Sequence, residues 1–296
     1  MSSSIPLLLW ALLLLSGANC QTTPAIQRIF LGRCSYFKQF GLNKPNIDCT
    51  KAYNVFLSAF AFKDPCNITM AAYDEYFNLT KQVLPRDKTL LWSGTEQLKS
   101  MYCFQGANCY ANDQFLASYI PNKMSWCGSK TDPSGMNFTG CRTYDPTTCP
   151  NHVTHSFWAA ASAQIASGST GLVQLLLNGT RTTGSAYSRT SFFGLYELPN
   201  LDPKKVNPLG ALVALTPGKP VKENCNNGSL TLLRTDATAK GLNYTCATNP
   251  PRVRHLSCAF FAPTVEPNEC KFEVTSSYSF ANKNTGPPSR FSYVRS

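Results

Sequence analysis

Apolar residues recur along this chain in two patterns, one typical of helices and one typical of buried strands. Within residues 51–63, Tyr53, Phe56 and Phe60 fall near helical spacing, and the Asp-Pro pair that follows predicts the end of this helix. Residues 171–177 instead form an apolar stretch before an Asn-Gly turn, which predicts a strand covered on both faces. The chain therefore combines helices with at least one covered strand.

The remaining pattern predicts the order of the elements. Further helices are expected over residues 70–83, 114–120, 155–166 and 229–240. Further strands are expected over residues 89–92, 192–198, 211–215 and 242–247. Residues 136–151 are rich in Gly, Pro and Thr and are expected to form a loop. Because helices come first and strands alternate with helices later, we expect a mixed α/β fold in which a helical N-terminal lobe joins an α/β lobe.

The first twenty residues have the pattern of a secretory signal. Residues 7–15 are apolar, and Ala18 and Cys20 would occupy the positions that signal peptidase reads. A membrane anchor is the alternative, but the run is too short to cross about 30 Å of hydrocarbon. No second run of spanning length follows, and the basic tail over residues 276–296 has no lipid-anchor pattern. We therefore expect a signal peptide over residues 1–20, no membrane anchor, and a protein that is secreted or held in the lumen of secretory granules.

Cysteines and glycosylation sequons agree with the secretory route. Of thirteen cysteines, Cys20 would leave with the signal, and the twelve that remain predict a disulfide framework. Zinc is the competing interpretation, but there is no Cys-x-x-Cys pair and there are only three histidines, so no metal is expected. Six Asn-x-Ser/Thr sequons predict a glycoprotein, at Asn67, Asn78, Asn137, Asn178, Asn227 and Asn243.

Composition narrows the partners. Hydrophobic residues make up 43% and charged residues 15%, which excludes a disordered chain. The net charge is +11, but Lys and Arg are scattered and form no run, so nucleic acid is not expected as a partner. A basic protein also attracts phosphorylated small molecules, and that class stays open.

An ordered series of short motifs is more specific than composition. Its members are residues 31–34 (LGRC), 48–51 (DCTK), 59–67 (AFAFKDPCN), 91–95 (LWSGT), 126–128 (WCG), 157–158 (FW), 177–180 (LNGT) and 191–201 (SFFGLYELPNL). At this spacing the series closely resembles the ADP-ribosyl cyclase and NAD glycohydrolase family, from about Leu31 to Cys270. No single motif decides this, and the ordered set carries the resemblance.

The resemblance implies a fold and a disulfide pattern. It implies a small, mainly parallel sheet flanked by helices, with the active-site cleft between the two lobes. Residues 21–86 and 111–169 would form the helical lobe, and residues 87–110 and 170–275 the α/β lobe. The implied family pairs are Cys34–Cys49, Cys66–Cys149, Cys127–Cys141, Cys225–Cys246 and Cys258–Cys270. Cys103 and Cys109 are left, and we expect them to pair with each other as a local addition.

The resemblance also implies the site residues. A carboxylate beside the anomeric carbon stabilises an oxocarbenium-like ribose, as an ion pair or as a covalent ester, and Glu197 matches that position. Trp92 and Trp158 match the two tryptophans of the pocket, and Ser162 matches a serine near the ribose and phosphates. Phe192 matches a position at which an aromatic ring resembles the soluble cyclases and helps to fold the substrate for cyclisation.

Two positions depart from the family pattern. Asp113 replaces the glutamate that contacts the nicotinamide amide and is one methylene shorter, so its carboxylate would fall short of the amide or reach it through a water. Asn122 replaces a second acidic residue and carries no charge. These changes leave the balance of cyclisation and hydrolysis open, whereas cleavage at Glu197 should survive.

We therefore expect a secreted enzyme that cleaves NAD or NADP, a small-molecule dinucleotide, as a substrate and needs no cofactor. No phosphate-binding glycine motif is present, which fits NAD as a substrate and not as a redox cofactor. The alternative is a nucleotide-binding glycoprotein of the same fold with weakened catalysis, and a third class is a purely structural glycoprotein. Whether the chain forms a homodimer stays open.

Overall fold

The sheet is the frame on which the site is built. The computed structural model describes residues 25–104, 109–261 and 268–271. Within them, β1 (Thr89–Ser93), β4 (Gly171–Asn178), β5 (Val206–Ala214) and β6 (Tyr244–Thr248) pair in parallel in the order β1-β4-β5-β6. The central strand β4 is the apolar stretch whose composition predicts a covered strand. Because all four strands are parallel, their carboxyl ends meet on one side of the sheet, and β1 is an edge strand because it comes first in this order.

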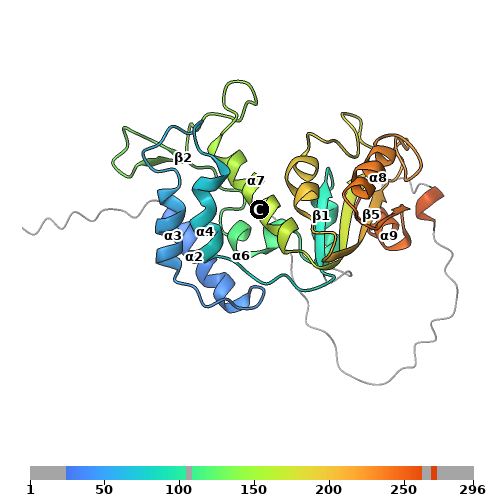
Figure 1. Ribbon diagram of the computed structural model, residues 1–296, viewed down its shortest axis with the longest axis horizontal. Coiled ribbons are helices and arrows are strands. Elements are labelled where there is room, and N and C mark those ends of the chain that lie inside the picture. Colours follow the sequence, from blue (N-terminus) through green and yellow to red (C-terminus); the bar gives the residue numbers. More distant parts are fainter. Residues whose placement is uncertain (1–24, 105–108, 262–267, 272–296) are drawn as a thin grey trace, which may run out of the picture.

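Helices cover both faces of this sheet (Figure 1). Leu91, Leu175 and Val213 face a core that is shared with α8 (Ser229–Ala239) and with the end of α7 (Val153–Gly168). The opposite face packs against α5 (Glu96–Tyr102) and α9 (Pro251–Phe261). Two covered faces explain why the central strands β4 and β5 are largely apolar.

The N-terminal helices form a separate aromatic core. It is built by α2 (Ala25–Phe40), α3 (Cys49–Ser58), η1 (Met70–Tyr73), α4 (Asp74–Leu79), α6 (Leu116–Tyr119) and the first half of α7. Phe56 lies at its centre, with the rings of Phe30, Tyr76 and Trp126 within about 5.3 Å. In Figure 1, α7 runs between this core and the sheet. Residues of α7 therefore contact both.

Six disulfides join cysteines within the described residues. The pairs are Cys34–Cys49, Cys66–Cys149, Cys103–Cys109, Cys127–Cys141, Cys225–Cys246 and Cys258–Cys270. They are the same six pairs that the resemblance and the leftover cysteines imply. Cys66–Cys149 closes 83 residues and ties the start of α7 to the aromatic core.

One predicted strand is wrong, and it carries the residue of greatest interest. Residues 192–198 form a π-helical turn, η4 (Phe193–Glu197), followed by η5 (Leu198–Asn200). The aromatic and apolar residues here have the composition of a strand, but the turn is fixed by Ser191. Its hydroxyl accepts from the backbone of Gly194, and its carbonyl accepts from Leu195.

Several helix ends also differ from the prediction. The helix expected over residues 51–63 ends at Ser58, because Leu57 carbonyl accepts from both Phe60 and Ala61 and Phe62 adopts a left-handed φ of 61°. The helix expected over residues 70–83 ends at Leu79, where the Thr80 hydroxyl donates to a carbonyl of the last turn. In contrast, the expected loop over 136–151 contains only the two-residue strand β3 (Met136–Asn137), paired with β2 (Cys127–Gly128).

The expected signal peptide and the basic tail lie outside the described residues. The division into two lobes by residue range stays a prediction. No helix within residues 25–104, 109–261 and 268–271 is both long and apolar enough to cross a membrane.

Candidate active site

The π-helical turn η4 brings Glu197 to the interior. The turn packs against α7 on one side and β1 on the other. Gly194 permits the turn to close against the segment before it, because a Cβ at that position would lie 2.4 Å from the Ser188 carbonyl oxygen. Turns of the π type are rare and are frequent at functional sites. The predicted strand would have left Glu197 at a strand end, whereas the turn buries it.

Glu197 is a buried carboxylate with one oxygen held and one free. Glu197 is 6% exposed, and its Oε1 accepts a hydrogen bond of 2.9 Å from the Ser162 hydroxyl. Oε2 is buried and has no hydrogen-bond partner among the described residues. Burial raises the pKa of Glu197 to about 7, and the hydrogen bond from Ser162 acts in the opposite direction. Such an oxygen is suited to a positive charge that arrives with a substrate.

Trp158 shares one face of α7 with Ser162, the serine that holds this carboxylate. Ser162 follows Trp158 by four residues, so the two side chains point to the same face of the helix. Trp158 is half-buried and packs edge-on against Phe157, with 5.3 Å between ring centroids. The indole therefore packs against the aromatic core and keeps part of its surface exposed.

Four rings form an aromatic wall beside the turn, defined as Tyr144, His155, Phe192 and Tyr196. His155 stacks on Tyr144 with centroids 3.9 Å apart and planes 2° apart, and it contacts Phe192 at 5.0 Å. Phe192 in turn contacts Tyr196 at 5.4 Å. Tyr144 is 43% exposed and Phe192 37% exposed, so part of the wall is open to a ligand. Exposed flat rings of this kind bind a flat base by stacking.

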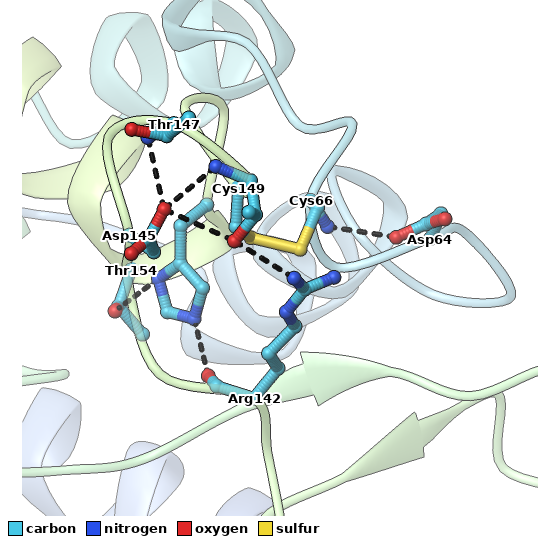
Figure 2. Close-up of a disulfide and its surroundings, with 9 residues drawn as sticks. Asp64, Cys66, Arg142, Asp145, Thr147, Cys149 and Thr154 are labelled. Atoms are coloured by element: carbon cyan, nitrogen blue, oxygen red, sulfur yellow. Dashed lines mark hydrogen bonds between the residues drawn. A yellow bond between two sulfur atoms is a disulfide. The ribbon is translucent and has the colours of Figure 1, made fainter.

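The loop that carries Tyr144 is fastened on both sides (Figure 2). The Arg142 guanidinium donates to Thr148, and Asp145 accepts from the backbone of Thr147 and Thr148. His152 bonds the Arg142 carbonyl oxygen through Nε2 at 2.7 Å, which holds the loop to the start of α7. With Cys149 joined to Cys66, Tyr144 is held in place against His155.

Trp92 lines a cavity at the carboxyl end of the sheet. The cavity has a volume of about 460 Å³ and is bounded by the ends of β1, β4 and β5 and by α5 and α9. Among its lining residues are Gly94, Asn178, Thr216 and Phe261. The Asn178 amide donates to the Gly94 carbonyl at 3.2 Å and so joins the ends of β1 and β4. Glu197 does not line this cavity, although the turn η4 that carries it packs against β1, the strand of Trp92.

Asp113 lies in η3 (Asn112–Gln114), which packs on α7. Its Oδ1 forms an ion pair with the Lys99 ammonium, whose nitrogen also lies 5.2 Å from the centre of the Trp92 ring. The sequence analysis did not identify Lys99, because α5 reads as an ordinary polar helix. Asn122 lies in the turn after α6, and its backbone carbonyl accepts from Arg33 at 2.5 Å.

The structure thus brings some of the predicted site residues together. Glu197 and Ser162 are joined by a hydrogen bond, and Trp158 lies on the same face of α7 as Ser162. Phe192 directly precedes the turn that carries Glu197. Asp113 is connected to Trp92 through Lys99, and no hydrogen bond of the described residues joins Asn122 to Glu197. The wall residues Tyr144 and His155 were missed. His155 could have been found from the sequence, because it precedes Trp158 by three residues and this spacing places both on one side of a helix.

The sequon asparagines differ in their surroundings. Four are exposed, at Asn67, Asn78, Asn227 and Asn243, and Asn137 is half-buried. Asn178 is half-buried as well, and its Nδ2 donates to Gly94 as described above. Within the described ranges, no group of three or more His, Cys, Asp and Glu side chains is arranged to hold a metal ion.

Comparisons with known proteins agree on one family. A family model described as ADP-ribosyl cyclase matches residues 23–266. The ADP-ribosyl cyclase/cyclic ADP-ribose hydrolase of Aplysia kurodai is 34% identical over 241 residues, which are 80% of this chain and 84% of that protein. The human ADP-ribosyl cyclase/cyclic ADP-ribose hydrolase 2 is 32% identical over 238 residues, or 80% of this chain and 73% of that protein. A crystal structure of Aplysia cyclase with the substrate NGD and the product cGDPR superposes with a TM-score of 0.76 at 32% identity, over 84% of this chain and 98% of that chain.

Proposed function

This chain belongs to the ADP-ribosyl cyclase family, and we propose that it cleaves NAD at the bond between nicotinamide and ribose. The products are nicotinamide with cyclic ADP-ribose or ADP-ribose. One observation carries the proposal: Glu197 is a buried carboxylate with one oxygen fixed by Ser162 and the other without a partner. NADP is accepted as a second dinucleotide substrate, and no separate cofactor takes part.

Glu197 acts on the charge that the reaction creates. As the bond between C1′ and the pyridine nitrogen breaks, its electron pair stays on the nitrogen and nicotinamide leaves as a neutral molecule. The positive charge then lies on C1′ and the ring oxygen of the ribose, where Glu197 Oε2 stabilises it as an ion pair or as an ester. Burial makes this interaction stronger than the same contact in water. The free energy needed to remove the carboxylate from water is spent during folding, before the substrate binds.

The rings near Glu197 orient the dinucleotide. Trp158 is held edge-on by Phe157 and offers a flat surface on the same face of α7 as Ser162. Phe192 and the rest of the aromatic wall offer further ring surface beside the turn. If a ring of the wall stacks on adenine, the adenine is brought back toward C1′ and attacks it to close the cyclic product. Attack by water at the same carbon gives ADP-ribose.

The route of the protein through the cell is proposed from the sequence and the disulfides. Six disulfides form and persist in an oxidising compartment. Together with the expected signal peptide and six sequons, they support a glycoprotein that is secreted or stored in secretory granules. Exposed asparagines such as Asn67 and Asn227 are accessible to glycan addition.

Product analysis tests the reaction. The purified full chain is incubated with NAD, and separately with NGD, and the released nicotinamide and the sugar nucleotides are separated and quantified. The proposal expects nicotinamide in equal amount to the sum of cyclic and linear products. Thermal stabilisation by NAD without nicotinamide release would support the alternative, a binding glycoprotein with weakened catalysis. Neither effect would be expected of a purely structural protein.

A further inference from the structure

His155 contacts the ring of Phe192 from a different element of the fold. Phe192 packs on two rings of the described residues, His155 with centroids 5.0 Å apart and Tyr196 with centroids 5.4 Å apart. Tyr196 lies within η4 itself, the turn that Phe192 begins, whereas His155 lies on α7. Because Phe192 is 37% exposed, water surrounds part of its ring. The contact with His155 therefore ties a partly exposed ring to the helix.

His155 is itself held by a stack. Its ring lies parallel to that of Tyr144, with centroids 3.9 Å apart and planes 2° apart. The loop that carries Tyr144 is fastened by the Cys66–Cys149 disulfide. Burial lowers the pKa of His155, and the neighbouring His152 acts in the same direction, so the ring is neutral at neutral pH. A neutral ring packs between other rings without the loss of hydration that a charge would suffer.

One face of α7 reaches both ends of the turn. His155, Trp158 and Ser162 follow one another at spacings of three and four residues, which places them on the same side of the helix. His155 contacts Phe192 at the start of the turn, and Ser162 donates to Glu197 at its end. Two residues seven positions apart lie about 10 Å apart along a helix axis. Two contacts with one helix therefore set how Phe192 is oriented relative to the carboxylate.

We infer that His155 is a positioning residue for the choice of product: by ring contact it holds Phe192 in the orientation that favours cyclisation over hydrolysis. The inference rests on the proposed function, in which Phe192 helps to fold the dinucleotide. Both products form after nicotinamide has left. A nitrogen of the purine base forms the new bond to C1′ in the cyclic product, and a water oxygen forms it, with loss of a proton, in the linear product.

The orientation of Phe192 affects these two reactions unequally. Ring closure needs the purine base to be held over C1′, and a surface that is already fixed reduces the entropy lost in that step. Water reaches C1′ without such a surface. A loosened Phe192 therefore slows ring closure and leaves hydrolysis and the release of nicotinamide in place.

The cyclic fraction of the products from NGD tests this inference in the full chain. His155→Ala removes the ring contact and should lower the cyclic fraction by about twofold or more, while nicotinamide release stays within about tenfold of wild type. His155→Phe keeps a flat ring and should keep the wild-type fraction. His255→Ala, at an exposed histidine of α9, is the matched control and should change neither quantity.

A double variant shows whether His155 acts through Phe192. His155→Ala combined with Phe192→Ser should give the same cyclic fraction as Phe192→Ser alone, within about 1.5-fold, because no ring is left to hold. If His155→Ala fails to fold, Tyr144→Ala replaces it. That variant removes the ring that holds His155 and should also lower the cyclic fraction, whereas Tyr144→Phe should keep it.

Three results would overturn the inference: an unchanged cyclic fraction in the folded alanine variant, an equal loss in His155→Phe, or a further loss by the same factor in the double variant. A wild-type protein that releases nicotinamide but forms no cyclic product would overturn it as well. Absence of nicotinamide release from the wild-type protein would instead reject the proposed function, and the inference with it.

Discussion

Ser162 donates one hydrogen bond of 2.9 Å to Oε1 of Glu197, and this contact leaves Oε2 as the free oxygen of a buried carboxylate. The two residues lie on α7 and η4 and are 35 positions apart in the chain. The contact holds the carboxylate in one rotamer, so its orientation is set before a substrate binds. Preorganised charge of this kind stabilises a transition state without reorganisation during the reaction.

The first prediction concerns pH. Because the pKa of Glu197 is about 7 and the carboxylate must be ionised to stabilise the ribose cation, kcat/KM for nicotinamide release should rise with pH up to about 7 and level off above it. The Ser162 hydrogen bond lowers this pKa, so Ser162→Ala should move the rising limb to higher pH. Ser167→Ala, at an exposed serine on the same helix, is the control and should leave the limb in place. If kcat/KM of Ser162→Ala rises over the same pH range as in wild type, the hydrogen bond from Ser162 does not lower the pKa of Glu197.

The second prediction concerns stability. The folded-state pKa of Glu197, about 7, lies above its ordinary value of 4.5, so the folded protein holds this proton more tightly than the unfolded chain. The free energy of unfolding therefore loses a contribution as pH rises from 4.5 through 7. Glu197→Gln removes the titration and should gain about 3 kcal/mol relative to the wild-type protein between pH 4 and pH 8.

Denaturant unfolding at the two pH values measures this difference. Glu75→Gln, at an exposed glutamate of α4, controls for loss of charge alone and should show no such gain. If the free energies of unfolding of Glu197→Gln and wild type differ by the same amount at both pH values, the pKa of Glu197 is not raised by folding.

The third prediction concerns the product. Phe192 is a partly exposed ring of the aromatic wall and is expected to hold the adenine end of a folded substrate. Phe192→Ser should lower the cyclic fraction of the products from NGD by about threefold or more, while the rate of nicotinamide release stays within about tenfold of wild type. Leu195→Ser changes another exposed apolar residue of the same turn and should leave the product ratio unchanged. An unchanged cyclic fraction in Phe192→Ser would show that Phe192 does not promote cyclisation.

The fourth prediction concerns the segment that leads into η4. Asp236 on α8 accepts two hydrogen bonds from the Arg189 guanidinium, at 2.9 and 2.6 Å, and one from the Tyr187 hydroxyl at 2.8 Å. Asp236→Ala leaves the buried Tyr187 hydroxyl without its acceptor, so it should lower the free energy of unfolding by about 1–3 kcal/mol. Lys205→Ala breaks an exposed ion pair and should change it by less than about 0.5 kcal/mol. Equal effects of the two variants in denaturant unfolding would contradict this.

The sequence predicted the fold where the signal was long and regular. The apolar residues of β4 and the alanine-rich helix α7 have patterns that few other structures satisfy, and both form as expected. The twelve cysteines and the order of the motifs placed the chain in its family. The mixed α/β fold with a parallel sheet follows from those features.

The sequence failed where a contact decides the local structure. The π-helical turn of η4 has a strand-like composition, and only the backbone contacts of Ser191 and the close packing of Gly194 make it a turn. Lys99 has an ordinary position in a short polar helix, and nothing local indicates that Asp113 pairs with it. Tyr144 lies in a loop whose course depends on the Cys66–Cys149 disulfide. These residues come together through tertiary structure, which no local pattern encodes.

The rate of nicotinamide release by Glu197→Gln tests the central claim most directly. The variant keeps the size of the side chain and removes the charge, and a thermal shift with NAD checks that it still binds the dinucleotide. We expect its kcat to fall by about a thousandfold or more, whereas Glu75→Gln keeps the wild-type rate. A folded, NAD-binding Glu197→Gln protein that releases nicotinamide at the wild-type rate would contradict the account.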